Sequence, residues 1–126
     1  VLGEFPHWDW TLSTQENRFA VTSCYPDGGP KTYFTGIQKI DRFSGKVEVH
    51  NFGDYRFTGE PLMVAKPNAK SDEEFYIMCY VYNGNTDKTE VVLMDSQDFT
   101  GEMAVIKLKH HLPQGFHGMF TSKIFL

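Results

Sequence analysis

The sequence LPQGFHGMF, residues 112–120, contains the histidine around which the rest of the chain is arranged. His117 lies between a bulky ring and a glycine, so the backbone can approach other segments closely while the imidazole keeps one direction. Counting back 57 residues from His117 reaches Glu60, and a further 56 residues reaches Glu4. Two acids and an imidazole therefore recur at nearly one period, each beside a glycine. Two interpretations of His117 are open at this point, a metal ligand or a hydrogen-bonded core residue.

The period also holds along whole segments, and seven short runs between turn residues predict strands. The matching positions are Phe19 with Phe75, Cys24 with Cys79, and the turn at 41–46 with the turn at 95–102. The strand-like runs are rich in β-branched and aromatic residues and lie at 18–25, 35–41, 46–52, 60–66, 75–82, 89–95 and 103–109. No stretch shows helical periodicity.

A repeat of about 56 residues with four short strands and no helix is typical of a β-propeller blade. We therefore predict an all-β chain made of two consecutive four-stranded antiparallel blades and a closing strand. The repeat units are expected at about 3–58 and 59–116 and the closing strand at 117–125, all within one propeller domain spanning 1–126. The alternative architecture is a β-sandwich.

The two architectures place Glu4, Glu60 and His117 differently. The first strand of each blade lines the channel of a propeller, so the three side chains would converge on its axis, whereas a sandwich would scatter them along its edges. Together they could hold a metal in two ways: all three bind it, or the carboxylates accept the second ring N–H of ligand imidazoles and aim them. The chain offers one well-placed imidazole, so residues outside these 126 must complete any metal site. The other histidines are predicted to be solvated surface residues: His7, His50, His110 and His111.

Composition limits the functions that the chain can have. A length of 126 residues suits one compact domain, and 40% hydrophobic residues argue against disorder. A net charge of −4 and a pI near 5.7 provide no basic surface for nucleic acid. No apolar run approaches the roughly 18 residues of a membrane span, and no signal peptide is visible.

Cys24 and Cys79 lie in apolar runs, which favours buried, reduced thiols and a reducing compartment. The chain begins at Val1, so we expect it to be a piece of something longer.

Four features together resemble the C-terminal part of the carotenoid cleavage oxygenase family, which includes carotenoid, retinoid and lignostilbene oxygenases and the retinoid isomerase of the eye. They are GEFP at 3–6, GEP at 59–61, the strands between them, and LPQGFHGMF at 112–120, whose ending looks closest to the animal members. The resemblance implies a seven-bladed propeller with a helical cap and an axial non-haem Fe(II) held by four histidines, three of them hydrogen-bonded to glutamates. Carried over, His117 would be one iron ligand, and Glu4 and Glu60 would be two of the glutamates behind the ligands.

The same resemblance implies a function. Fe(II), with O2 as co-substrate, would cleave a conjugated C=C bond of a carotenoid, apocarotenoid or related apolar polyene, and the chain by itself would be inactive. Candidates for an apolar substrate tunnel are Phe57, Phe116 and Phe120. The expected partners are that polyene and the remainder of the propeller, in the cytoplasm, with peripheral membrane association through regions outside this chain. The alternatives are a non-catalytic interaction module or a retinyl-ester isomerase of the same family.

Overall fold

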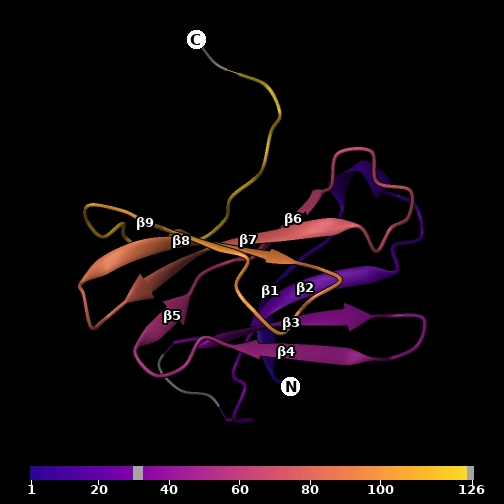
Figure 1. The fold of residues 1–126 in the computed structure, drawn as a ribbon. Coiled ribbons are helices and arrows are strands. Elements are labelled where there is room, and N and C mark those ends of the chain that lie inside the picture. Colours follow the sequence, from indigo (N-terminus) through magenta and orange to yellow (C-terminus); the bar gives the residue numbers. More distant parts are fainter. Residues whose placement is uncertain (30–32, 125–126) are drawn as a thin grey trace.

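The computed structural model describes residues 1–29 and 33–124, which form two antiparallel sheets (Figure 1). The first sheet has the order β1-β2-β3-β4; its strands are β1 at Gly3–His7, β2 at Phe19–Cys24, β3 at Gly36–Asp41 and β4 at Val47–Asn51. The second has the order β5-β7-β8-β9 with β6 also paired to β7; its strands are β5 at Arg56–Thr58, β6 at Leu62–Ala65, β7 at Phe75–Asn83, β8 at Lys88–Asp95 and β9 at Ala104–Lys107. Within the described ranges the one helix is the 3-10 turn η1 at Trp10–Leu12. The all-β prediction is confirmed.

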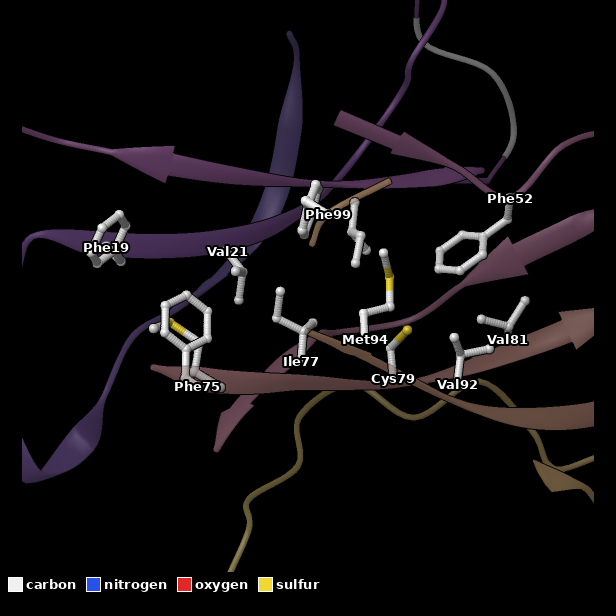
Figure 2. Close-up of a cluster of buried hydrophobic side chains, with 12 residues drawn as sticks. Phe19, Val21, Phe52, Phe75, Ile77, Cys79, Val81, Val92, Met94 and Phe99 are labelled. Carbon is white, nitrogen blue, oxygen red and sulfur yellow. The ribbon is translucent and has the colours of Figure 1, made fainter. Parts of the chain in front are cut away.

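The core lies between the two sheets (Figure 2). On β7, every second residue is buried, which is the pattern of a strand with one face against a partner layer. These side chains meet buried residues of β2 and β3, and a fully buried Val or Ile contributes about 1.5–3 kcal/mol through removal of its apolar surface from water. The buried cluster consists of Phe19, Val21, Ile37, Phe52, Met63, Phe75, Ile77, Cys79, Val81, Val92, Met94 and Phe99.

The inner strand of the second sheet is interrupted. β5 pairs with the C-terminal part of β7 and β6 with its N-terminal part, and residues 59–61 separate the two. Sequence patterns predict β6 but not β5, because three residues carry no readable alternation. The sheets divide between Asn51 and Arg56, whereas the predicted repeat units divide at residue 58. The strand register also corrects one match: Cys79 corresponds to Ser23, since Ile77 and Val21 occupy equivalent pairs.

After β9 come residues 108–118, which we call the strap. Its residues 112–118 line one pocket with Leu62, Tyr80 and Tyr82. Tyr80 and Tyr82 alternate with the core residues of β7, so the strap crosses the face of the second sheet that is turned away from the first. Beyond the strap, residues 119–122 line a groove beside β6, and the tail of the chain extends away from both sheets (Figure 1). The predicted closing strand at 117–125 is wrong for residues 117–124, which form no strand because no described strand pairs with them; residue 125 lies outside the described residues.

A buried polar cluster also joins the sheets, and Arg56 is its centre. Its guanidinium donates to Glu90 Oε2 from Nε at 3.0 Å and Nη2 at 2.7 Å, and to Glu102 from Nη1 at 2.5 Å and Nη2 at 2.9 Å. His50 of β4 lies 3.6 Å from Glu102 Oε1. The prediction that His50 is a solvated surface residue is wrong, because its side chain is only 11% exposed where the second sheet covers it.

Candidate metal centre

Each inner strand contains a bulge at its Gly-Glu motif. Between the pairs Glu4–Ser23 and His7–Val21, β1 has one residue more than β2, and Phe5 there has a φ of 55°. The second sheet repeats this arrangement, with one extra residue on the inner strand between the pairs that Thr58 and Leu62 form with β7. A β-bulge bends a strand and changes the direction of the side chains at the insertion. The two glutamates therefore occupy equivalent, specially oriented positions.

Hydrogen bonds from the first sheet hold the second bulge in place. Ser23 Oγ donates to the carbonyl oxygen of Gly59 at 2.6 Å, and Thr58 N donates to the carbonyl oxygen of Phe34 at 2.9 Å. Pro61 is fully buried and follows directly, where a residue without an N–H leaves no unpaired donor in the interrupted ladder. The bulge that carries Glu60 is therefore held against the first half of the chain.

Glu60 binds the strap at two points. One carboxylate oxygen lies 3.1 Å from His117 Nδ1, and the other accepts the Gly118 backbone N–H at 2.7 Å. The Glu60 side chain is 11% exposed, whereas His117 is 66% exposed. With Nδ1 facing the carboxylate, Nδ1 carries the proton and the Nε2 lone pair is left for a ligand. This is the arrangement by which a carboxylate fixes the tautomer of a metal-binding imidazole.

Glu4 is connected to this pair through its neighbour. The Phe5 ring packs edge-on against His117, with 6.0 Å between ring centroids, and against Phe116 at 5.7 Å. The Glu4 side chain is exposed and has no hydrogen bond or ion pair with the described residues. The structure thus brings together Glu60 and His117, and places the strand of Glu4 beside them without a direct contact of its carboxylate.

The three predicted tunnel residues lie in different surroundings. Phe116 is 75% exposed and lies against the His117 ring, with 5.0 Å between centroids. Phe57 stacks on Tyr82 at 6.4 Å, and Phe120 lines a separate groove beside His7 and β6. Of the three, only Phe116 contacts the histidine.

His7 is a second histidine, after His50, whose predicted environment is wrong. It ends β1 and is 2% exposed, so the prediction of a solvated loop residue is wrong. Its Nδ1 accepts the Met63 N–H at 3.0 Å, and its Nε2 lies 2.8 Å from the Trp10 indole nitrogen, Nε1. Burial lowers the pKa of His7 below its ordinary value, partly offset by the nearby carboxylates of Glu60 and Asp9. The side chain is buried where its lone pair accepts a backbone N–H of β6. Because β6 is distant in the sequence, no local pattern around His7 predicts this contact.

The described residues offer one candidate metal ligand, His117, and no complete site. Within residues 1–29 and 33–124, no group of three or more His, Cys, Asp or Glu side chains could hold a metal ion. His110 and His111 are exposed, as predicted. The donor set still fits a shared metal, because an exposed imidazole with its second nitrogen fixed by a buried carboxylate presents a neutral nitrogen ligand outward. No helix in the described part of the chain is long and apolar enough to cross a membrane.

Two facing antiparallel sheets with the same bulge on each inner strand are the arrangement expected of successive propeller blades. The chain belongs to the retinal pigment epithelial membrane protein family (RPE65), whose sequence profile matches residues 1–122. The structure superposes on a crystal structure of an ACO/RPE65 chimera with a TM-score of 0.90 and 25% identity, covering 96% of this chain and 26% of the chimera. Cobalt-substituted Synechocystis ACO matches with a TM-score of 0.86 and 27% identity, over 91% of this chain and 24% of that one. These neighbours are seven-bladed propellers, so the predicted fold class is confirmed and the sandwich is excluded.

Relatives of known activity support the predicted family. The apocarotenoid-15,15'-oxygenase of Synechocystis is 35% identical over 86 residues, which cover 68% of this chain and 18% of that protein. The chloroplastic 9-cis-epoxycarotenoid dioxygenase NCED6 of Arabidopsis thaliana is 36% identical over 89 residues, covering 71% of this chain and 15% of that enzyme. The matched part of the chain therefore corresponds to less than a fifth of the length of each of these two proteins. The resemblance to carotenoid cleavage oxygenases is confirmed at the level of the family.

Proposed function

We propose that this chain is part of an iron-dependent dioxygenase that cleaves a conjugated C=C bond of a carotenoid, apocarotenoid or similar polyene. In this proposal, Nε2 of His117 is one iron ligand, Glu60 fixes its tautomer, and Glu4 plays the same part for a ligand outside the chain. The observation that carries the proposal is the double contact of Glu60 with His117 Nδ1 and Gly118 N.

The charge arrangement supports the role of Glu60. A neutral imidazole leaves the full charge of a divalent metal uncompensated, and a carboxylate behind the imidazole offsets it without occupying a coordination position. Because the carboxylate also accepts the Gly118 N–H, it cannot move away from the ring without breaking a second hydrogen bond. Bound Fe(II) would supply activation of O2, whose two oxygen atoms end in the two carbonyl products.

The residues next to the histidine suit an apolar substrate. Phe5 and Phe116 contact the His117 ring and each other, and Phe116 is largely exposed. We propose that these rings contribute to an apolar wall beside the metal, completed by the rest of the propeller. By itself the chain is expected to be inactive, because a single imidazole cannot retain iron.

The test uses the full-length protein that contains this chain. His117→Ala is expected to abolish bound iron, and Glu60→Gln to weaken iron binding by about 10–100-fold. His111→Ala is the matched control, since its exposed ring lies 3.7 Å from Asp87 and makes no contact with Glu60, and it should retain full iron content. Iron is measured by elemental analysis, and activity with an apocarotenoid and, separately, a retinyl ester. Full iron content in the His117→Ala protein would overturn the proposal, and isomerisation without cleavage would assign the family's other reaction.

A further inference from the structure

Thr89 holds the start of the strap. It is the second residue of β8 and is 2% exposed. Its carbonyl oxygen accepts the Leu108 N–H at 2.9 Å, and its own N–H donates to the His110 carbonyl oxygen at 3.4 Å. Its hydroxyl oxygen accepts the Leu112 N–H at 2.7 Å. Three successive attachment points of the strap therefore converge on one buried threonine.

Between Thr89 and Glu60 the strap has no other polar attachment. Residues 113–116 make no hydrogen bond to any residue that the structure describes, and the next attachments are His117 and Gly118 on Glu60. A pocket of about 90 Å³ lies against this span, bordered by Leu62, Tyr80 and Tyr82. The span therefore has free space beside it. The position of His117 is determined by the attachments at the two ends of the span, on Thr89 and on Glu60.

We propose that Thr89 is a positioning residue for the metal-binding histidine, acting through the strap; this inference rests on the proposed function, in which His117 binds the metal. Glu60 fixes the orientation of the imidazole. The Thr89 hydroxyl holds Leu112 in place and so fixes the point from which the chain runs to His117. Without that hydroxyl, the Leu112 N–H loses its acceptor, and the span that leads to His117 can shift over the pocket.

The experiment compares three variants of the full-length protein. Thr89→Val keeps the side-chain shape and removes the hydroxyl, and Thr89→Ser keeps the hydroxyl. Thr22→Val is the matched control, because Thr22 is also a buried strand threonine, and its hydroxyl accepts Gln38 Nε2 at 2.9 Å, in the first sheet. Circular dichroism and thermal melting establish that each variant folds.

Two readouts follow the strap without relying on activity. Amide hydrogen exchange is measured at Leu112 and Gly118, and cobalt(II) binding to the iron-free protein is followed by its visible absorption. In Thr89→Val, both amides should exchange about tenfold faster, the factor that corresponds to one lost hydrogen bond of ordinary strength. Cobalt affinity should fall about tenfold as well. Thr89→Ser should restore both to within about twofold, and Thr22→Val should change neither.

The outcomes separate this inference from the proposed function. Faster exchange confined to Leu112, with Gly118 and cobalt affinity unchanged, overturns the positioning role while leaving His117 as a ligand. Loss of cobalt in His117→Ala, together with tenfold weaker binding in Thr89→Val, supports both. If His117→Ala binds cobalt like the unmodified protein, the proposed function fails, and the positioning role fails with it. Equal effects of Thr89→Val and Thr22→Val would show general destabilisation and would also overturn the inference.

Discussion

Replacing Arg56 with leucine should be among the most damaging single changes in this chain. The guanidinium donates four hydrogen bonds to the carboxylates of Glu90 and Glu102, whose side chains are 6% and 19% exposed. Leucine retains much of the apolar volume but leaves both carboxylates without their cation. Removing one partner of a buried ion pair costs about 3–5 kcal/mol. Because Glu102 keeps some contact with water, we expect about 3 kcal/mol at pH 7, at the lower end of that range.

Urea denaturation of the chain at pH 7, followed by circular dichroism, measures this loss. Arg42→Leu is the matched control, because Arg42 is exposed and its guanidinium makes one hydrogen bond, to the Asn17 carbonyl oxygen; its loss should stay within about 0.5 kcal/mol. Adding Glu90→Gln and Glu102→Gln to Arg56→Leu should recover part of the stability by removing the uncompensated charges. Equal losses for Arg56→Leu and Arg42→Leu would refute the reasoning.

The pH dependence of the Arg56→Leu effect provides a second check. Hydrogen bonding to Arg56 holds the pKa of Glu102 below its ordinary value of 4.5. A carboxylate whose pKa is lowered on folding adds stability above its unfolded pKa, and this stability is lost as the pH falls through the folded pKa. The difference in stability between the unmodified chain and Arg56→Leu should therefore narrow below about pH 4.5. A difference that stays constant from pH 7 to pH 3 would contradict the assignment.

Three further predictions concern single positions. Gly3→Ala should destabilise the chain by about 1–3 kcal/mol in urea denaturation, since a Cβ there would lie 2.6 Å from the Ser23 carbonyl oxygen; an unchanged midpoint would show that β1 can move aside. Burial lowers the pKa of His7, so the folded chain binds fewer protons than the unfolded one and stability should fall as the pH drops below about 6.5. His7→Gln keeps an acceptor for the Met63 N–H and should lose less between pH 7.5 and 5.5, whereas equal losses would place the acid sensitivity elsewhere. Burial raises the pKa of Cys79 to about 12, so iodoacetamide at pH 8 should label it only after unfolding; rapid labelling of the native chain would contradict its burial.

Local patterns were sufficient for the hairpins and insufficient for the inner strands. The alternation in KVEVHNF at 46–52 and the turn before it predict β4 within one residue at each end. β5 has three residues, and it is a strand only because β7 extends beyond the part that β6 covers. No window of sequence can show that, since the cause is the length of a partner strand.

The candidate site was predictable only in part, because some of its contacts also depend on distant segments of the chain. The spacing of Glu60 and His117 predicts that they meet, and the structure places them 3.1 Å apart. That Glu60 also binds Gly118 N depends on the bulge, which the sequence marks only with a glycine and a proline. The burial of His7 and His50 depends on groups from the other sheet, so hydrophobicity alone misplaces both. The role of His117 at a metal stays a prediction.

The extra residue in each inner strand has a consequence for how such a protein can change over time. In a regular strand, a one-residue slip turns every following side chain to the opposite face, so the direction of one side chain is tied to that of all the others. Here the extra residue lets Glu4 and Glu60 take a direction that differs from the regular alternation of the strand. Mutations that repack the layer between the sheets can therefore accumulate without turning the acids, and the direction of the two acids and the composition of the interior become separately heritable traits.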